Sequence, residues 1–167
     1  ASDWQGTGGY YFWDVNAKAN YKLGPRDHIY LSAYTGKDKF YAKGFENKKE
    51  TFRADINWGN LTALLRWNHE FNNKLFGNLS ATYTRYQFEV FSKLSSNFGG
   101  TTSSFSALYK SGIYDVALKY DLDFIPSPRH YIKAGISGTS HQFKPGAVTL
   151  KNSDLPEANI DTAFNVS

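Results

Sequence analysis

Apolar and polar residues alternate strictly over the stretch from Tyr11 to Leu23. Aromatic or aliphatic side chains occupy the odd positions, whereas aspartate, asparagine and lysine occupy nearly all of the even ones. A repeat of two places successive side chains on opposite faces, so the stretch predicts a β-strand with one apolar and one polar face. Strands in soluble proteins usually have about five or six residues, and this alternation continues for much longer.

Five further segments alternate in the same way. They are residues 28–35, 52–71, 75–85, 114–124 and 132–137. In the 52–71 segment the apolar positions change phase at Gly59-Asn60, which predicts a β-bulge or a bend. Turn-forming sequences join the strands in pairs at Gly24–Asp27, Asn72–Lys74 and Pro126–Arg129. Polar stretches at 36–50 and 92–104 predict long loops between the pairs, and no period is visible from 143 to 167.

Together these elements predict an all-β fold, an antiparallel up-and-down sheet of six long strands in three hairpins. Alternation of short turns with long loops is typical of outer-membrane β-barrels. The ten residue steps from Tyr11 to Tyr21 span about 33 Å. At a tilt of about 40° this gives a height of about 25 Å, that of the apolar band of such barrels. Aromatic residues lie near both ends of the stretch, as they do at membrane interfaces. We therefore expect a transmembrane β-barrel segment of a bacterial outer membrane.

The number of strands sets a further expectation. Bilayer-spanning barrels have at least about eight strands, and an open sheet edge in hydrocarbon leaves backbone groups unsatisfied. We therefore expect residues 1–167 to be part of a larger outer-membrane β-barrel domain, whose plug and remaining strands are absent from this chain. A soluble barrel remains an alternative, because its strands also alternate, with the apolar face turned inward.

The amino-acid composition limits the kinds of binding site and catalytic site that the chain can form. The chain has no cysteine, which excludes disulfides and thiolate metal sites, and its net charge of +4 is too small to predict nucleic-acid binding. No apolar run approaches the roughly 18 residues of a membrane helix. The four histidines, His28, His69, His130 and His141, lack the spacing of metal ligands, and no nucleophile can be paired with a base. We expect no enzymatic activity, catalytic residue, metal or cofactor.

Lysines are dense in the predicted loop at 36–50. They are Lys37, Lys39, Lys43, Lys48 and Lys49, and three carboxylates in the same stretch oppose them. On the outer side of a membrane these charges would meet anionic lipopolysaccharide or an anionic ligand. The alternative is a solvated loop whose charges partly cancel.

Several of these strand sequences resemble barrel strands of TonB-dependent outer-membrane receptors from Bacteroidetes. The resemblance rests on Tyr10–Lys18, Ile29–Gly36, Trp58–Thr62, Leu65–His69 and Lys74–Phe76. It covers roughly residues 9–143. It implies a barrel of about 22 strands filled by an N-terminal plug, of which six strands would form roughly a quarter of the wall.

The resemblance also implies a function. Such a receptor binds a scarce nutrient from outside, such as a siderophore, a metal complex or a saccharide, and TonB supplies energy through the plug. No segment resembles the plug, so no ligand-binding residue is assigned. The expected partners are the lipid bilayer, lipopolysaccharide, the rest of the barrel and TonB, and nucleic acid is not among them. The alternatives are a passive porin or structural outer-membrane barrel, and a soluble ligand-binding β-barrel.

Overall fold

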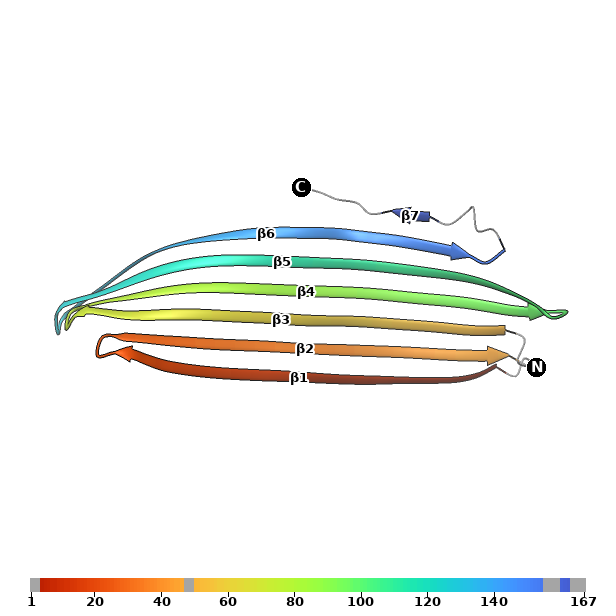
Figure 1. The fold of residues 1–167 in the computed structure, drawn as a ribbon, viewed down its shortest axis with the longest axis horizontal. Coiled ribbons are helices and arrows are strands. Elements are labelled where there is room, and N and C mark those ends of the chain that lie inside the picture. Colours follow the sequence, from red (N-terminus) through yellow and green to blue (C-terminus); the bar gives the residue numbers. More distant parts are fainter. Residues whose placement is uncertain (1–3, 47–49, 155–159, 163–167) are drawn as a thin grey trace.

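The computed structural model describes residues 4–46, 50–154 and 160–162, and these form one antiparallel sheet. The strands are β1 (Trp4–Gly24), β2 (Asp27–Glu46), β3 (Glu50–Asn72), β4 (Leu75–Phe98), β5 (Thr101–Ser127), β6 (His130–Asn152) and the short β7 (Ile160–Thr162). Each strand pairs with the next one along the chain, as Figure 1 shows. The prediction of an all-β, up-and-down fold with six long strands is confirmed.

Among the residues that the structure describes, no helix has the length and apolar character needed to cross a bilayer.

Two-residue turns connect the strands within each predicted hairpin. They lie at Pro25-Arg26, Asn73-Lys74 and Pro128-Arg129, all at one end of the sheet, which we call the turn end (Figure 1). The predicted turn positions are confirmed, although the strands continue further into them than expected. The opposite end of the sheet is called the far end.

The prediction of two long loops was wrong. Strand β2 continues through most of 36–50, and β4 and β5 continue through 92–104 to a two-residue turn. That turn is Gly99-Gly100, with φ values of +59° and +86°. Two consecutive positive φ values match the twist of a tight hairpin and favour glycine. As a result the six long strands have 20 to 27 residues, and all except β3 are much longer than the alternating segments predicted.

The predicted bulge at Gly59-Asn60 was also wrong. Gly59 pairs with Lys37 on one side and with Gln87 on the other, and the register is unbroken through both neighbouring pairs. The change of phase in the sequence therefore moves the apolar residues from one face of an uninterrupted strand to the other.

The C-terminal region is more regular than its sequence predicted. Strand β6 continues to Asn152, past the point where no period was visible. Its register with β5 shifts where Pro145 and Gly146 fall between the paired residues Lys144 and Ala147. Proline has no N–H to donate, so a bulge is one of the few places it can occupy within a sheet.

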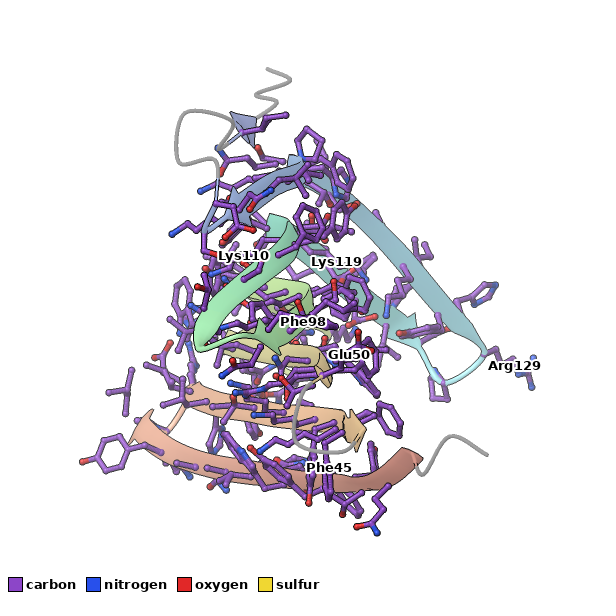
Figure 2. The ribbon with its side chains drawn as sticks, turned by 90° about the vertical axis from the view of Figure 1, so that its right-hand side faces the viewer. Phe45, Glu50, Phe98, Lys110, Lys119 and Arg129 are labelled. Atoms are coloured by element: carbon purple, nitrogen blue, oxygen red, sulfur yellow. The ribbon has the colours of Figure 1, made fainter. Side chains whose placement is uncertain are left out.

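The described residues form a single layer, and none of them packs as a second layer against the sheet. None of the described hydrophobic residues is buried, and the only described polar residue that is buried is Asp55. Figure 2, viewed from the far end, shows side chains projecting from the strands without a covering layer. Because a folded domain gains most of its stability from buried apolar surface, this sheet needs an apolar environment or further protein around it.

Candidate functional site

The pairing register assigns the side chains to two faces. We call face A the side that holds Ala17, Ala33, Ala63, Tyr83 and Val116, which lie in one row across β1 to β5. We call face B the side that holds their neighbours Lys18, Ser32, Leu64, Thr82 and Ala117, which form the next row. The two faces differ in character, and the difference reverses along the strands.

Face A is apolar in the half near the turn end. Its residues there form what we call the apolar band: Val15, Ala17, Ala19, Tyr21, Ile29, Leu31, Ala33, Leu61, Ala63, Leu65, Trp67, Leu79, Ala81, Tyr83, Val116, Leu118, Tyr120 and Ile136. Val116 and Leu118 are 56% and 55% exposed. A continuous apolar surface of this extent is not left in contact with water by a stable protein.

Face B is polar in the same half, and its charges form pairs. Lys119 lies 2.9 Å from Asp121, and Lys133 lies 3.8 Å from Asp123. The two aspartate side chains are only 16% exposed, much less than the apolar residues across the sheet. Side chains on the concave side of a curved sheet shield one another, so this contrast indicates that the sheet curves toward face B.

A hydrogen-bonded group stabilises the turn end. Asp27 accepts a hydrogen bond from the Trp67 indole at 2.9 Å and contacts His69 Nδ1 at 2.7 Å. The hydrogen bond with His69 is the main reason that the pKa of Asp27 lies below its usual value, and the bond from Trp67 adds to this. Asp27 precedes the first band residue of β2, Ile29, so it lies outside the apolar band.

The far half of face B is apolar and aromatic. Its largest side chains form what we call the aromatic patch: Tyr10, Phe12, Phe40, Trp58, Phe88 and Tyr109. The Tyr10 ring lies 6.3 Å from that of Trp58, and the Phe88 ring lies 6.3 Å from that of Tyr109. Tyr10 also donates a hydrogen bond to Asp38, which raises the pKa of Tyr10. Among the described residues of this half, face B carries no lysine or arginine.

A hollow of about 690 Å³ opens beyond the aromatic patch at the far end. Phe52, Leu94 and Phe105 supply its apolar lining, and Ser103 and Asp154 supply polar groups. Apolar walls with a few polar groups are typical of ligand sites. Both the patch and the hollow lie on face B.

The far half of face A carries the cations. We call them the basic belt: Lys37, Lys39, Lys43, Arg53, Arg85, Lys93 and Lys110. The carboxylates on the same part of these strands are Asp55, which lies 2.6 Å from Arg53, and Glu89, which lies 3.1 Å from Lys110. Over β2 to β5 the belt has a net charge of +5, from seven cations and two carboxylates, and Lys144 and Lys151 of β6 lie on the same face.

The lysines predicted to lie in a loop thus lie in a strand. Lys37, Lys39 and Lys43 all occupy odd positions of β2, so they share face A. The even position between the first two belongs to Asp38, which lies on face B, so its charge does not cancel theirs. Lys48 and Lys49 lie outside the described residues. The even spacing of the three lysines was the signal for a strand, and it was outweighed by the high polarity of the stretch.

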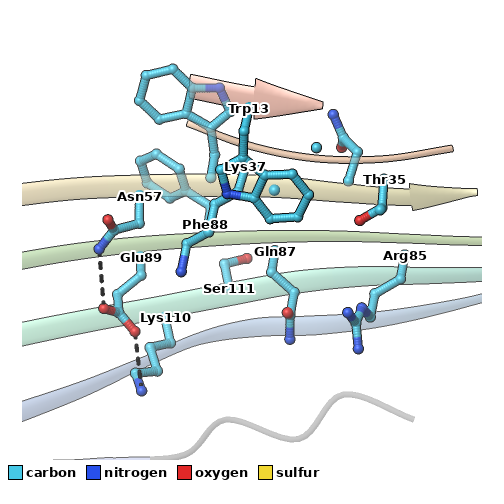
Figure 3. A pocket seen from close by; sticks show the side chains of 14 residues that line it. Trp13, Thr35, Lys37, Asn57, Arg85, Gln87, Phe88, Glu89, Lys110 and Ser111 are labelled. Carbon is cyan, nitrogen blue, oxygen red and sulfur yellow. Dashed lines mark hydrogen bonds and ion pairs between the residues drawn. The ribbon is translucent and has the colours of Figure 1, made fainter. Parts of the chain in front are cut away.

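A second hollow, of about 460 Å³, lies at the border between the apolar band and the basic belt. Gly59, which has no side chain to fill it, lies between Lys37 and Gln87 in the register. Arg85, Gln87 and Glu89 extend side by side from one side of β4 in Figure 3, with Asn57 and Lys110 bonded to Glu89. Trp13 also lines the hollow, next to the apolar band.

The four histidines do not converge. His69 contacts Asp27, and His141 contacts Asp115 at 2.8 Å. His130 contacts Ser127 at 2.8 Å, and the His28 ring lies 6.2 Å from that of Tyr30. No group of three or more metal-ligating side chains able to hold an ion occurs within the described part of the chain.

Comparison with known proteins adds no relative, because neither the protein-family models nor the curated proteins contain a match to this chain. The distribution of side chains over the two faces is therefore the feature that bears on function.

Proposed function

We propose that this chain forms part of the wall of an outer-membrane β-barrel, with face A toward lipid and face B toward the interior. The observation that carries the proposal is the apolar band on a single uncovered sheet, none of whose described hydrophobic residues is buried. A lipid environment removes the band from water, and neighbouring strands of a closed barrel satisfy the sheet edges.

The proportions of the strands support this orientation. The band covers at most six residue steps of a strand, from Val15 to Tyr21 on β1 and from Leu61 to Trp67 on β3, so most of each long strand would extend beyond it. A strand of 23 residues is about 76 Å long, which gives a height of about 58 Å at a tilt of about 40°. The six steps of the band correspond to about 20 Å along a strand and about 15 Å of height at the same tilt, within the apolar height of about 25 Å of such barrels. The strands continue past the band mainly toward the far end, which supports an orientation with the far end on the outside of the cell.

We further propose that the whole protein is a TonB-dependent receptor that imports a scarce nutrient such as a siderophore, a metal complex or a saccharide. The resemblance of the strand sequences supports this class. The aromatic patch and the hollow at Phe52, Leu94 and Phe105 support a ligand site on the interior face of the wall, near its extracellular end. Aromatic rings there would pack against the apolar or sugar-ring faces of a nutrient.

The orientation can be tested with single cysteines, because the natural chain has none. Ala81 and Thr82 are adjacent on β4 and lie on opposite faces. In outer membranes that contain the complete protein, we expect a membrane-impermeant maleimide to label Thr82→Cys and to leave Ala81→Cys unlabelled. If the protein is instead a soluble barrel, with its apolar face turned inward, both cysteine variants will be soluble without detergent.

The transport class needs a separate test. Uptake of ferric siderophores and of labelled oligosaccharides is compared in cells that carry the gene, with TonB present or deleted. An energised receptor loses uptake without TonB, whereas a passive porin retains it. Retained uptake would exclude the receptor while leaving the barrel assignment intact.

A further inference from the structure

The basic belt begins where the apolar band ends, on the same face of the sheet. Thr35 of β2 pairs with Leu61 of β3 in the last row of the band, and the next row pairs Lys37 with Gly59. Adjacent rows on one face are two residues apart, or about 6.6 Å along a strand, which is about 5 Å of height at a tilt of about 40°. Lipid headgroups occupy about 5 to 7 Å on each side of the hydrocarbon. Lys37 therefore lies at the depth of lipid phosphates.

The hollow at Gly59 has free cations on both sides. Lys37 pairs with Gly59 across β2 and β3, and Arg85 lies on β4 one row nearer the turn end, where it pairs with Leu61 in the last row of the apolar band. Neither Lys37 nor Arg85 forms an ion pair with a residue that the structure describes, whereas Lys110 is paired with Glu89 at 3.1 Å. An anionic group in the hollow would gain charge-assisted hydrogen bonds from these two side chains without displacing a carboxylate.

We propose that this hollow binds a phosphate group of lipopolysaccharide, the anionic glycolipid of the outer leaflet, an inference that rests on the proposed orientation in the membrane. The height of the belt favours a glycolipid over a phospholipid. Lys43 lies three rows beyond Lys37, about 20 Å further along the strand, and it pairs with Arg53 across the sheet. A phospholipid headgroup ends well below that level, whereas the anionic inner sugars of lipopolysaccharide extend along it.

The segregation of charge supports the same occupant. In the far half, the cations lie on face A, and the charged side chains described on face B are the carboxylates Asp38 and Glu50. A belt that served only solubility would not need positive charges on one face and negative charges on the other. Trp13, which is 46% exposed at the edge of the hollow, adds an aromatic group at the interfacial depth.

The test uses the complete protein in non-ionic detergent, with purified rough-type lipopolysaccharide that retains lipid A and the inner core. We expect the double variant Lys37→Gln/Arg85→Gln to bind it about tenfold more weakly or worse, since each lost charge-assisted bond is substantial. The matched control is Lys18→Gln/Lys22→Gln, which removes two cations from face B of β1 and should leave binding unchanged. Gly59→Gln should weaken binding without any change in charge, because it fills the hollow.

The probes decide between phosphate sources. Chemically dephosphorylated lipopolysaccharide and inorganic phosphate should both fail to compete, and phosphatidylglycerol vesicles should compete poorly. Equal losses in the two double variants, or equal binding of dephosphorylated lipid, would overturn the inference. If the wild-type protein enters bilayers but does not bind lipopolysaccharide, only this inference is lost. If it does not enter bilayers, the proposed function is lost as well.

Discussion

Trp58 and Trp67 lie on the same uninterrupted strand but on opposite faces of the sheet. Trp67 belongs to the apolar band of face A, and Trp58 belongs to the aromatic patch of face B. Nine residues separate them, an odd number, so period-two geometry places them on opposite sides. The apolar character of the sheet thus changes face between the two tryptophans, at the row that contains Lys37 and Gly59.

The unbroken register behind this change predicts a specific cross-link. Trp58 pairs with Phe88 of β4, and directly opposed residues have Cα atoms about 4.5 to 5.5 Å apart, within the range of a disulfide. The double variant Trp58→Cys/Phe88→Cys should therefore oxidise readily to a disulfide, seen as a mobility shift that reductant reverses.

The control moves one cysteine to the adjacent position. In Trp58→Cys/Gln87→Cys the second side chain points to face A, so no intramolecular disulfide should form. Rapid cross-linking of the control, with a slow reaction of Trp58→Cys/Phe88→Cys, would mean that a bulge at Gly59 shifts the register after all.

Much of the fold could be predicted from the sequence, because the turn-end half obeys one simple rule. From Tyr11 to Leu23 the apolar residues keep one face, and prolines and asparagines mark the turns. The far half could not be assigned in this way. There the alternation continues with the apolar residues on the other face, as at Phe40 and Trp58, and a single sequence does not distinguish a change of environment from a bulge.

The candidate site was harder to predict than the fold. The lysines at 37, 39 and 43 were identified as a possible contact with lipopolysaccharide, but Arg85 and Lys110 lie far from them in the sequence. Only the register places these two on the same face, next to Gly59. The aromatic patch was missed for the same reason, since its members come from five strands.

Adjacent leucines on β3 test which face contacts lipid. Leu65 lies in the apolar band, and Leu64 lies on face B among polar neighbours such as Ser32 and Thr82. Leu65→Lys should destabilise the folded protein in lipid vesicles by about 2 to 4 kcal/mol, because a lysine there faces hydrocarbon. Leu64→Lys should lower the free energy of unfolding much less, because the ammonium group of the new lysine stays hydrated. Denaturant unfolding in vesicles measures both, and a reversed order would place water on face A.

The turn at the far end predicts a backbone effect that is independent of the membrane. Gly100 has a φ of +86°, and no atom lies close to the position of an added Cβ. Gly100→Ala should therefore cost about 1 kcal/mol through backbone strain alone. Gly138→Ala is the control, since Gly138 has equally open space but no positive φ. The free energy of unfolding should fall for the first variant and stay nearly constant for the second. Equal effects would contradict a left-handed conformation at Gly100.

The hydrogen bonds at the turn end predict a stability that depends on pH. Asp27 has a lowered pKa in the folded protein, mainly because of its hydrogen bond with His69 and secondly because of that from Trp67. The ionised carboxylate is thus favoured by folding, so its contribution is fully present above the unfolded pKa, which is about 3.9. It is lost as the pH falls through the lower folded value.

The corresponding experiment compares Asp27→Asn with the wild type in denaturant unfolding between neutral pH and about pH 2. The wild type should be more stable at neutral pH, and the difference between the two proteins should shrink below about pH 4, where the wild-type carboxylate becomes protonated. Asp14→Asn, which changes an aspartate of β1 outside this group, should follow the wild-type pH dependence. A constant difference between Asp27→Asn and the wild type across the whole range would show that the charge of Asp27 plays no part in stabilising the turn end.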